Sequence, residues 1–168
     1  MQKVKTLLLL LIAFPVLCHG QFIGLGGQYS QASDGQFFIN MGFPTYHQDN
    51  KLNLFNTSGL EYTTSGGAKL SGLNIKPVQL STYFSEDLYN NNPLTCLLGV
   101  DAGYLFDFRK NHKNTIVVTP NLYVDYKVFF IKTGYDIDTF HGNSQFFIRA
   151  GIGIGLGTFK VFSGTKIK

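Results

Sequence analysis

Hydrophobic and polar residues alternate with a period of two along most of the chain beyond Gln21. In the segment 146–157 the even positions are apolar, whereas the odd positions are Phe147, Arg149 and four glycines. The segment 98–108 alternates in the same way. Successive side chains of a strand point to opposite faces, so this alternation predicts half-buried β-strands. No long segment repeats its apolar residues at the three-and-four spacing of a helix, and the predicted fold class is therefore all-β.

The apolar positions change parity within the segment 116–137, which is too long for one ordinary strand. They are mainly even up to Val124 and odd from Phe129 onward. A tight turn near 126–128 explains the change, because a strand keeps each side chain on a fixed face. The stretch 45–58 is expected to hold a bulge or a long loop. In total the pattern predicts eight strands, at about 22–30, 36–44, 59–65, 68–82, 94–107, 115–126, 128–138 and 146–160.

An alternating barrel directs its apolar face either inward to a ligand or outward to lipid. The polar face distinguishes the two arrangements, since it is rich in glycine rather than in the Lys, Glu and Thr expected on a wall that faces water. Glycine weakens an exposed strand, but in the crowded lumen of a small barrel it leaves room for bulky neighbours. We therefore predict an eight-stranded, antiparallel, up-and-down transmembrane β-barrel with a lumen filled by side chains. The lumen is predicted to hold a polar network of both charge signs, made of Asp101, Asp125, Lys132, Asp136 and Arg149.

The first twenty residues are typical of a cleaved secretory signal peptide. Lys3 and Lys5 precede an apolar run from Leu7 to Leu17 that is too short to span a bilayer, and Gly20 offers a small residue for cleavage. The predicted organisation is a signal peptide over 1–20 and a single barrel domain over 21–168. Cleavage removes two lysines and lowers the formal charge from +4 to +2, which leaves no basic patch for nucleic acid. The expected location is the outer membrane.

Residues with catalytic or metal-binding chemistry are few. None of the histidines beyond the signal peptide has a second His, Cys or carboxylate at the spacing that a metal site on one strand or loop requires. We expect neither a metal nor a cofactor. The best candidates for a catalytic group are His141, Ser144 and Asp138, because a base must activate a hydroxyl nucleophile. Nothing in the sequence shows that they converge, and a role other than catalysis is favoured.

Several segments resemble small outer-membrane β-barrel proteins of the porin-like superfamily. The stretch 76–88, KPVQLSTYFSEDL, followed by 97–106, resembles a strand, a Tyr-Phe turn and the next strand of such proteins. The sequence TPNLY at 119–123 and the glycine-alternating segment 148–157 resemble later strands. This resemblance implies an outer-membrane barrel that is embedded in a lipid bilayer.

The leading functional hypothesis is a structural or interaction protein of the outer membrane. Its partner would be another envelope protein or a surface ligand, contacted through loops at 31–35, 108–114 and 139–145. Two alternatives stay open. One is a lipid-modifying barrel hydrolase that uses His141 and Ser144. The other is a soluble secreted barrel that binds an apolar ligand in an apolar lumen.

Overall fold

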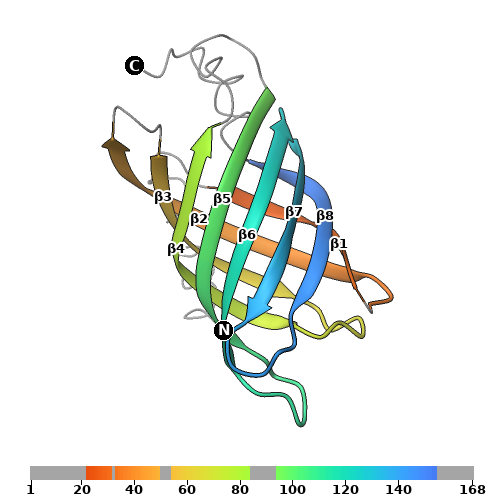
Figure 1. The fold of residues 1–168 in the computed structure, drawn as a ribbon. Helices are drawn as coiled ribbons and strands as arrows, with labels where there is room; N and C mark the ends of the chain where they lie inside the picture. The colour runs from red at the N-terminus through yellow and green to blue at the C-terminus, as the bar shows by residue number, and fades with distance from the viewer. Residues whose placement is uncertain (1–21, 32, 50–53, 84–93, 155–168) are drawn as a thin grey trace, which may run out of the picture.

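Eight antiparallel strands form a closed barrel in the computed structural model, which describes residues 22–31, 33–49, 54–83 and 94–154 (Figure 1). The strands are β1 (Phe22–Ser30), β2 (Gln36–Asp49), β3 (Leu54–Thr63), β4 (Gly72–Tyr83), β5 (Leu94–Phe106), β6 (Thr115–Tyr126), β7 (Phe129–Asp138) and β8 (Gln145–Ile154). Each strand pairs with its neighbour in sequence, and β1 closes the barrel by pairing with β8. The predicted all-β class, strand number and antiparallel arrangement are confirmed. None of the described residues belongs to a helix that is long and apolar enough to cross a membrane.

Three of the predicted strand boundaries are wrong: the end of β2, the start of β3 and the start of β4. The segment 45–58 is mostly strand, because β2 and β3 continue beyond the expected ends and pair through Thr45 and Asn56, with an irregularity between Thr45 and Asp49. The strand β4 begins at Gly72 rather than at 68. The residues before it, 64–71, leave the sheet and fold across one end of the barrel. The expected signal peptide and the expected strand end at 155–160 lie outside the described residues.

The change of parity in the segment 116–137 coincides with a two-residue turn. Tyr126 at the end of β6 pairs with Phe129 at the start of β7, and Lys127 and Val128 connect them. Lys127 has a φ of 58°, in the left-handed region that tight hairpin turns use. The turn predicted near 126–128 is therefore confirmed.

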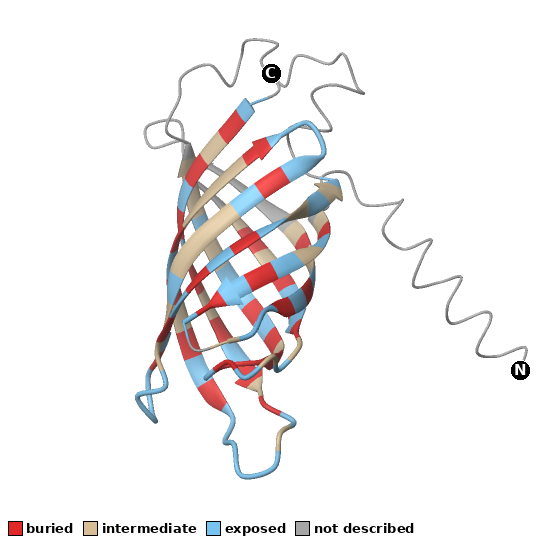
Figure 2. Cartoon of the chain, turned by 90° about the vertical axis from the view of Figure 1, so that its right-hand side faces the viewer, coloured by how far each residue is buried: buried red, intermediate tan, exposed pale blue. Residues whose placement is uncertain are grey.

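Buried and exposed residues alternate along the strands (Figure 2). The exposed positions include many large apolar side chains, whereas most of the buried side chains are polar or charged. Every charged strand residue whose side chain is described is turned into the lumen. We use the term apolar belt for the exposed large apolar side chains of the strands: Leu25, Tyr29, Phe37, Ile39, Leu60, Tyr62, Ile75, Val78, Leu80, Leu94, Leu98, Val100, Tyr104, Ile116, Tyr126, Phe129, Ile131, Tyr135, Ile137, Phe146, Ile148, Ile152 and Ile154. This arrangement is the reverse of a barrel with an apolar lumen.

Glycines on the lumen face allow bulky inward side chains and close backbone contact. A Cβ on Gly24 would lie 2.8 Å from the ring of Phe130, which itself packs edge to face against Phe38. At the seam between β1 and β8, Gly26 pairs with Gly151, and a Cβ on Gly151 would lie 2.3 Å from the backbone oxygen of Leu25. The barrel closes at this seam because neither residue carries a side chain.

The connections divide the barrel into two ends. We call the end that carries 31–35, 64–71, 107–114 and 139–144 the loop end. The opposite end, with the turn at Lys127 and Val128, is the turn end. Between them the lumen holds the polar side chains described next.

Candidate functional site

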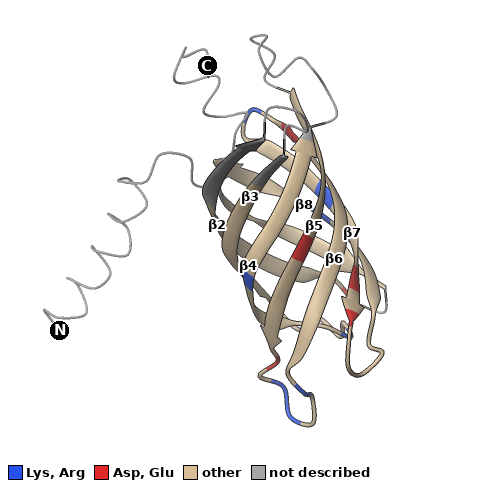
Figure 3. Ribbon diagram, turned by 60° about the vertical axis from the view of Figure 1, so that its left-hand side comes forward, with Lys and Arg blue, Asp and Glu red and all other residues tan. Residues whose placement is uncertain are grey.

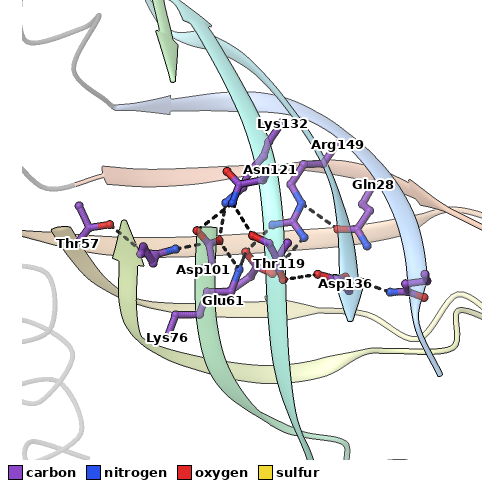
Figure 4. A network of polar contacts seen from close by, with 12 residues as sticks. Gln28, Thr57, Glu61, Lys76, Asp101, Thr119, Asn121, Lys132, Asp136 and Arg149 are labelled. Atoms are coloured by element: carbon purple, nitrogen blue, oxygen red, sulfur yellow. Dashed lines mark hydrogen bonds and ion pairs between the residues drawn. The ribbon is translucent and has the colours of Figure 1, made fainter. Parts of the chain in front are cut away.

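A network of charged and amide side chains fills the middle of the lumen (Figure 4). It draws one residue from each of six consecutive strands, β3 to β8, and its members are buried or partly buried. We call this set the lumen network: Glu61, Lys76, Asp101, Asn121, Lys132 and Arg149. The inward parity of each strand places these residues at similar depth, so that side chains far apart in sequence meet across the lumen.

Glu61 and Arg149 form the longest-range ion pair of the network. Two guanidinium nitrogens of Arg149 donate to the two carboxylate oxygens of Glu61, with Nη2 at 3.1 Å from Oε1. The guanidinium also donates from Nε to Oε1 of Gln28 at 2.9 Å. Its Cζ lies 4.5 Å from the ring centroid of Phe147 and 4.9 Å from that of Phe38. Paired hydrogen bonds and stacking on rings satisfy the planar guanidinium away from water.

Asp101 accepts hydrogen bonds from three other members of the network. Its Oδ2 lies 2.7 Å from Nζ of Lys132 and 3.2 Å from Nζ of Lys76, and its Oδ1 accepts from Nδ2 of Asn121 at 3.0 Å. Lys76 also donates to Oε2 of Glu61 at 2.9 Å, so one ammonium joins the two carboxylates. The network is therefore a continuous chain of opposite charges, which lowers the desolvation cost of each.

The lysine of β4 reaches the lumen through an irregularity in its strand. The register between β4 and β5 shifts between Ile75 and Val78, and this shift spans Lys76 and Pro77. Pro77 has no N–H to donate to a sheet ladder, and proline in a sheet is found mainly at such bulges or edges. The shift leaves both Lys76 and Gln79 pointing inward, where Gln79 Nε2 lies 3.4 Å from Asp101.

Asp136 and Asp125 also lie in the lumen, but outside the chain of contacts described above. Asp136 accepts from Thr119 Oγ1 at 2.7 Å and from Gln145 Nε2 at 3.4 Å. Asp125 lies nearer the turn end, 3.4 Å from the hydroxyl of Tyr123. Counting Asp136 with the lumen network, three carboxylates balance two lysines and one arginine, so this part of the lumen has a formal charge of zero.

The structure places all five residues of the predicted lumen network on the inward face and directly links Asp101 with Lys132. Arg149 joins them through Glu61 and Lys76, two residues that the sequence analysis did not name. The signal for both was present, because each is a single charged residue flanked by apolar strand residues. Their inward direction could not be derived from the pattern, because the bulge at Pro77 shifts the alternation in β4 and the start of β3 was not recognised.

The segment 64–71 closes the lumen at the loop end. Gln145 forms two hydrogen bonds with the backbone of Leu70, one to its N–H and one to its oxygen, both at 3.1 Å. Leu70 packs with Leu105 and Val117 in a small apolar cluster beneath. Arg109 donates to the backbone oxygens of Ala68 at 2.5 Å and Lys69 at 2.9 Å. These contacts hold the segment as a plug.

The candidate catalytic residues Asp138, His141 and Ser144 lie together at the loop end without the geometry of a triad. Nδ1 of His141 lies 3.6 Å from Oδ1 of Asp138, beyond hydrogen-bond distance. The hydroxyl of Ser144 accepts from the backbone N–H of Asp138 at 3.2 Å. These contacts hold the turn in shape, and the structure shows no hydrogen bond between the side chains of His141 and Ser144 among the residues it describes.

The carboxylate of Asp138 is instead occupied by donors of its own loop and of β6. It accepts from the hydroxyl of Thr115 and from three backbone amides, those of Phe140, His141 and Asn143. Burial acts to raise the pKa of Asp138, but these hydrogen bonds lower it to about 2. An ionised, fully bonded carboxylate of this kind stabilises the loop.

Asp107 plays the same part in the neighbouring loop, 107–114. Its carboxylate accepts from the backbone N–H of Arg109 at 3.0 Å and from Nε at 2.9 Å, and lies 3.4 Å from Nδ1 of His112. Burial acts to raise the pKa of Asp107, but the hydrogen bonds and charge of Arg109 hold it below its ordinary value. The hydrogen bonds of Asp107 therefore fix the loop, and its two lysines, Lys110 and Lys113, are exposed.

The free space in the lumen is small. A cavity of about 80 Å³ lies on the turn-end side of the network, lined by residues that include Asn40, Gln79, Tyr123 and Lys132. Ligand pockets for small molecules are commonly several hundred Å³. In the described ranges, no group of three or more His, Cys, Asp or Glu side chains is placed to hold a metal ion.

Comparison with known proteins assigns no family. No family model matches the chain, and no curated protein or solved structure matches it.

Proposed function

We propose that this protein is a small transmembrane β-barrel of the outer membrane that acts as a structural or interaction protein through its loop end. The observation that carries the proposal is the apolar belt together with the inward direction of the described charged strand residues. Water would disfavour such a wall by about 25 cal/mol for each Å² of apolar surface, and soluble monomers rarely expose apolar patches beyond a few hundred Å². A bilayer removes that cost.

The lumen supports a role that does not include transport of large solutes. The lumen network and the plug at 64–71 fill the interior, as expected for a barrel of eight strands. Four connections meet at the loop end, and their exposed residues offer a surface for contacts outside the membrane. Asp107 and Asp138 lie at this end, outside the belt, and keep two of those connections in shape.

The test compares a charge placed in the belt with the same charge placed at the loop end. Val100 is 46% exposed in the middle of β5, and Phe140 is 66% exposed in the loop after β7. Val100→Arg should lower the free energy of unfolding by about 2–4 kcal/mol if the wall faces lipid, whereas Phe140→Arg should change it by about 0–1 kcal/mol. Urea titration of protein inserted in vesicles measures both. Equal, small effects would contradict a lipid-facing wall, because surface substitutions in water usually stay within about 0.5 kcal/mol.

A further inference from the structure

We propose that the loop 107–114 binds the phosphate groups of anionic lipids in the leaflet around the barrel. This inference rests on the proposed function, because it requires an inserted barrel. It concerns three exposed side chains at the loop end: Phe108, Lys110 and Lys113. Figure 3 shows basic residues in the loop that follows β5, at the end of the barrel. The charged residues of the strands whose side chains are described face the lumen instead.

The first argument is the charge that this loop presents. Asp107, its one acidic residue, is buried and bonded to Arg109, so these two charges cancel within the loop. Among the described residues neither Lys110 nor Lys113 forms an ion pair, and both are exposed. The loop 107–114 therefore carries a formal charge of +2 on its surface. Lysine clusters next to a membrane segment attract anionic headgroups.

The second argument is the position of the lysines relative to apolar side chains. Phe108 lies two residues beyond the end of β5, whose outward residues include Tyr104, and is 71% exposed, more than any other large apolar residue described. Phe140, in the adjacent loop, is 66% exposed. Aromatic rings at the rim of a belt occupy the headgroup level. Lys110 lies two residues from Phe108, so its ammonium is within reach of lipid phosphates at that level.

The same observations favour lipid over a protein partner. A partner seated on the loop end would meet the loop tips, whereas Phe108 lies at the base of its loop, two residues beyond the end of β5. The base of the loop is fixed by the contacts of the Asp107 carboxylate and by the 3.1 Å hydrogen bond from the Asp107 N–H to Oδ1 of Asn114, and both lysines lie between these two residues in the chain. A ring in the headgroup layer and flanking cations together recognise a lipid rather than a free phosphate ion.

The experiment measures lipid that is retained by the full chain. The protein is inserted in phosphatidylcholine vesicles that contain a minor fraction of phosphatidic acid, then extracted in mild detergent, and the ratio of the two bound lipids is determined. Wild type should enrich phosphatidic acid over the bulk ratio. Lys110→Gln with Lys113→Gln should reduce the enrichment, by about fivefold for each lysine that contacts a phosphate. Lys69→Gln is the matched control, since this lysine is at the same end but its ammonium lies 3.5 Å from the backbone oxygen of Ser144.

Each result has a defined meaning. Loss of enrichment in the double variant alone supports the site. Equal loss in Lys69→Gln overturns it in favour of general charge attraction, and unchanged enrichment in the double variant also overturns it. If inorganic phosphate competes as well as phosphatidic acid, the loop binds free phosphate and the lipid assignment is wrong. A wild-type chain that fails to insert contradicts the proposed function itself, and heat-modifiable mobility of each variant distinguishes that failure from loss of the site.

Discussion

The ion pair between Glu61 and Arg149 offers the sharpest test of the filled lumen. Arg149→Met keeps an unbranched side chain between the rings of Phe38 and Phe147 but removes the guanidinium. Among the described side chains, Glu61 then keeps the bond from Lys76 at 2.9 Å, and the lumen network with Asp136 changes from neutral to one net negative charge. Removing one partner of a buried ion pair typically lowers the free energy of unfolding by about 3–5 kcal/mol, and we expect a loss of this size for Arg149→Met.

Removing both partners should lower the free energy of unfolding by much less than the sum of the two single changes. In Glu61→Leu with Arg149→Met, two lysines remain against Asp101 and Asp136, and the network is again neutral. The coupling energy in the double-mutant cycle should therefore reach about 3 kcal/mol, since removal of a complete buried pair is often neutral. Lys113→Met removes a positive charge from an exposed loop and should change stability by about 0.5 kcal/mol or less.

Urea titration in micelles, followed by far-UV circular dichroism and by the gel mobility of unboiled samples, measures these free energies. The chain has no tryptophan, so indole fluorescence cannot report on unfolding. Single variants within about 1 kcal/mol of wild type, or a double variant whose cost equals the sum of the singles, would refute the idea that the pair is buried and coupled.

The same titration tests two further predictions, and hydrogen exchange tests a third. Asp138→Asn should lower the free energy of unfolding at neutral pH by about 1–2 kcal/mol. The pKa of Asp138 falls from an ordinary 3.8 to about 2 on folding, so its stabilisation is present above about pH 4 and is lost as the pH falls toward 2. A difference between variant and wild type that does not change with pH would contradict this prediction. Gly151→Ala should lower the free energy of unfolding by more than about 2 kcal/mol, because its Cβ would lie 2.3 Å from a backbone oxygen of β1. Gly27→Ala is the control and should be tolerated, since the nearest atom to its Cβ would be 4.0 Å away. Gln145→Leu should speed hydrogen exchange of the 64–71 backbone several-fold, since Leu70 loses two hydrogen bonds, and unchanged exchange would show that the plug does not depend on this side chain.

The sequence predicted the faces of the strands well because the period of two is a local property. In β8 the outward series from Phe146 to Ile154 and the inward Phe147 and Arg149 follow from spacing alone. The turn at Lys127 and Val128 follows from a change of parity. Neither prediction requires knowledge of which strand pairs with which.

The contacts across the lumen could not be predicted in the same way. Glu61 and Arg149 are 88 residues apart, and Arg149 and Gln28 are 121 apart, so their meeting depends on closure of the whole barrel and on its register. The plug at 64–71 was missed because its anchor, Gln145, is 75 residues away. The three candidate catalytic residues show the opposite case, because they are neighbours in one turn, and the hydrogen bonds of Asp138 and Ser144 stabilise that turn.

Insertion into a bilayer is the most direct test of the central claim that the apolar belt faces lipid. The full chain is expressed with its N-terminal segment, the outer-membrane fraction is washed with carbonate, and the retained protein is compared on gels with and without boiling. The account predicts retention after the wash and a shift in mobility on boiling. Release into the aqueous fraction, with no shift, would contradict it.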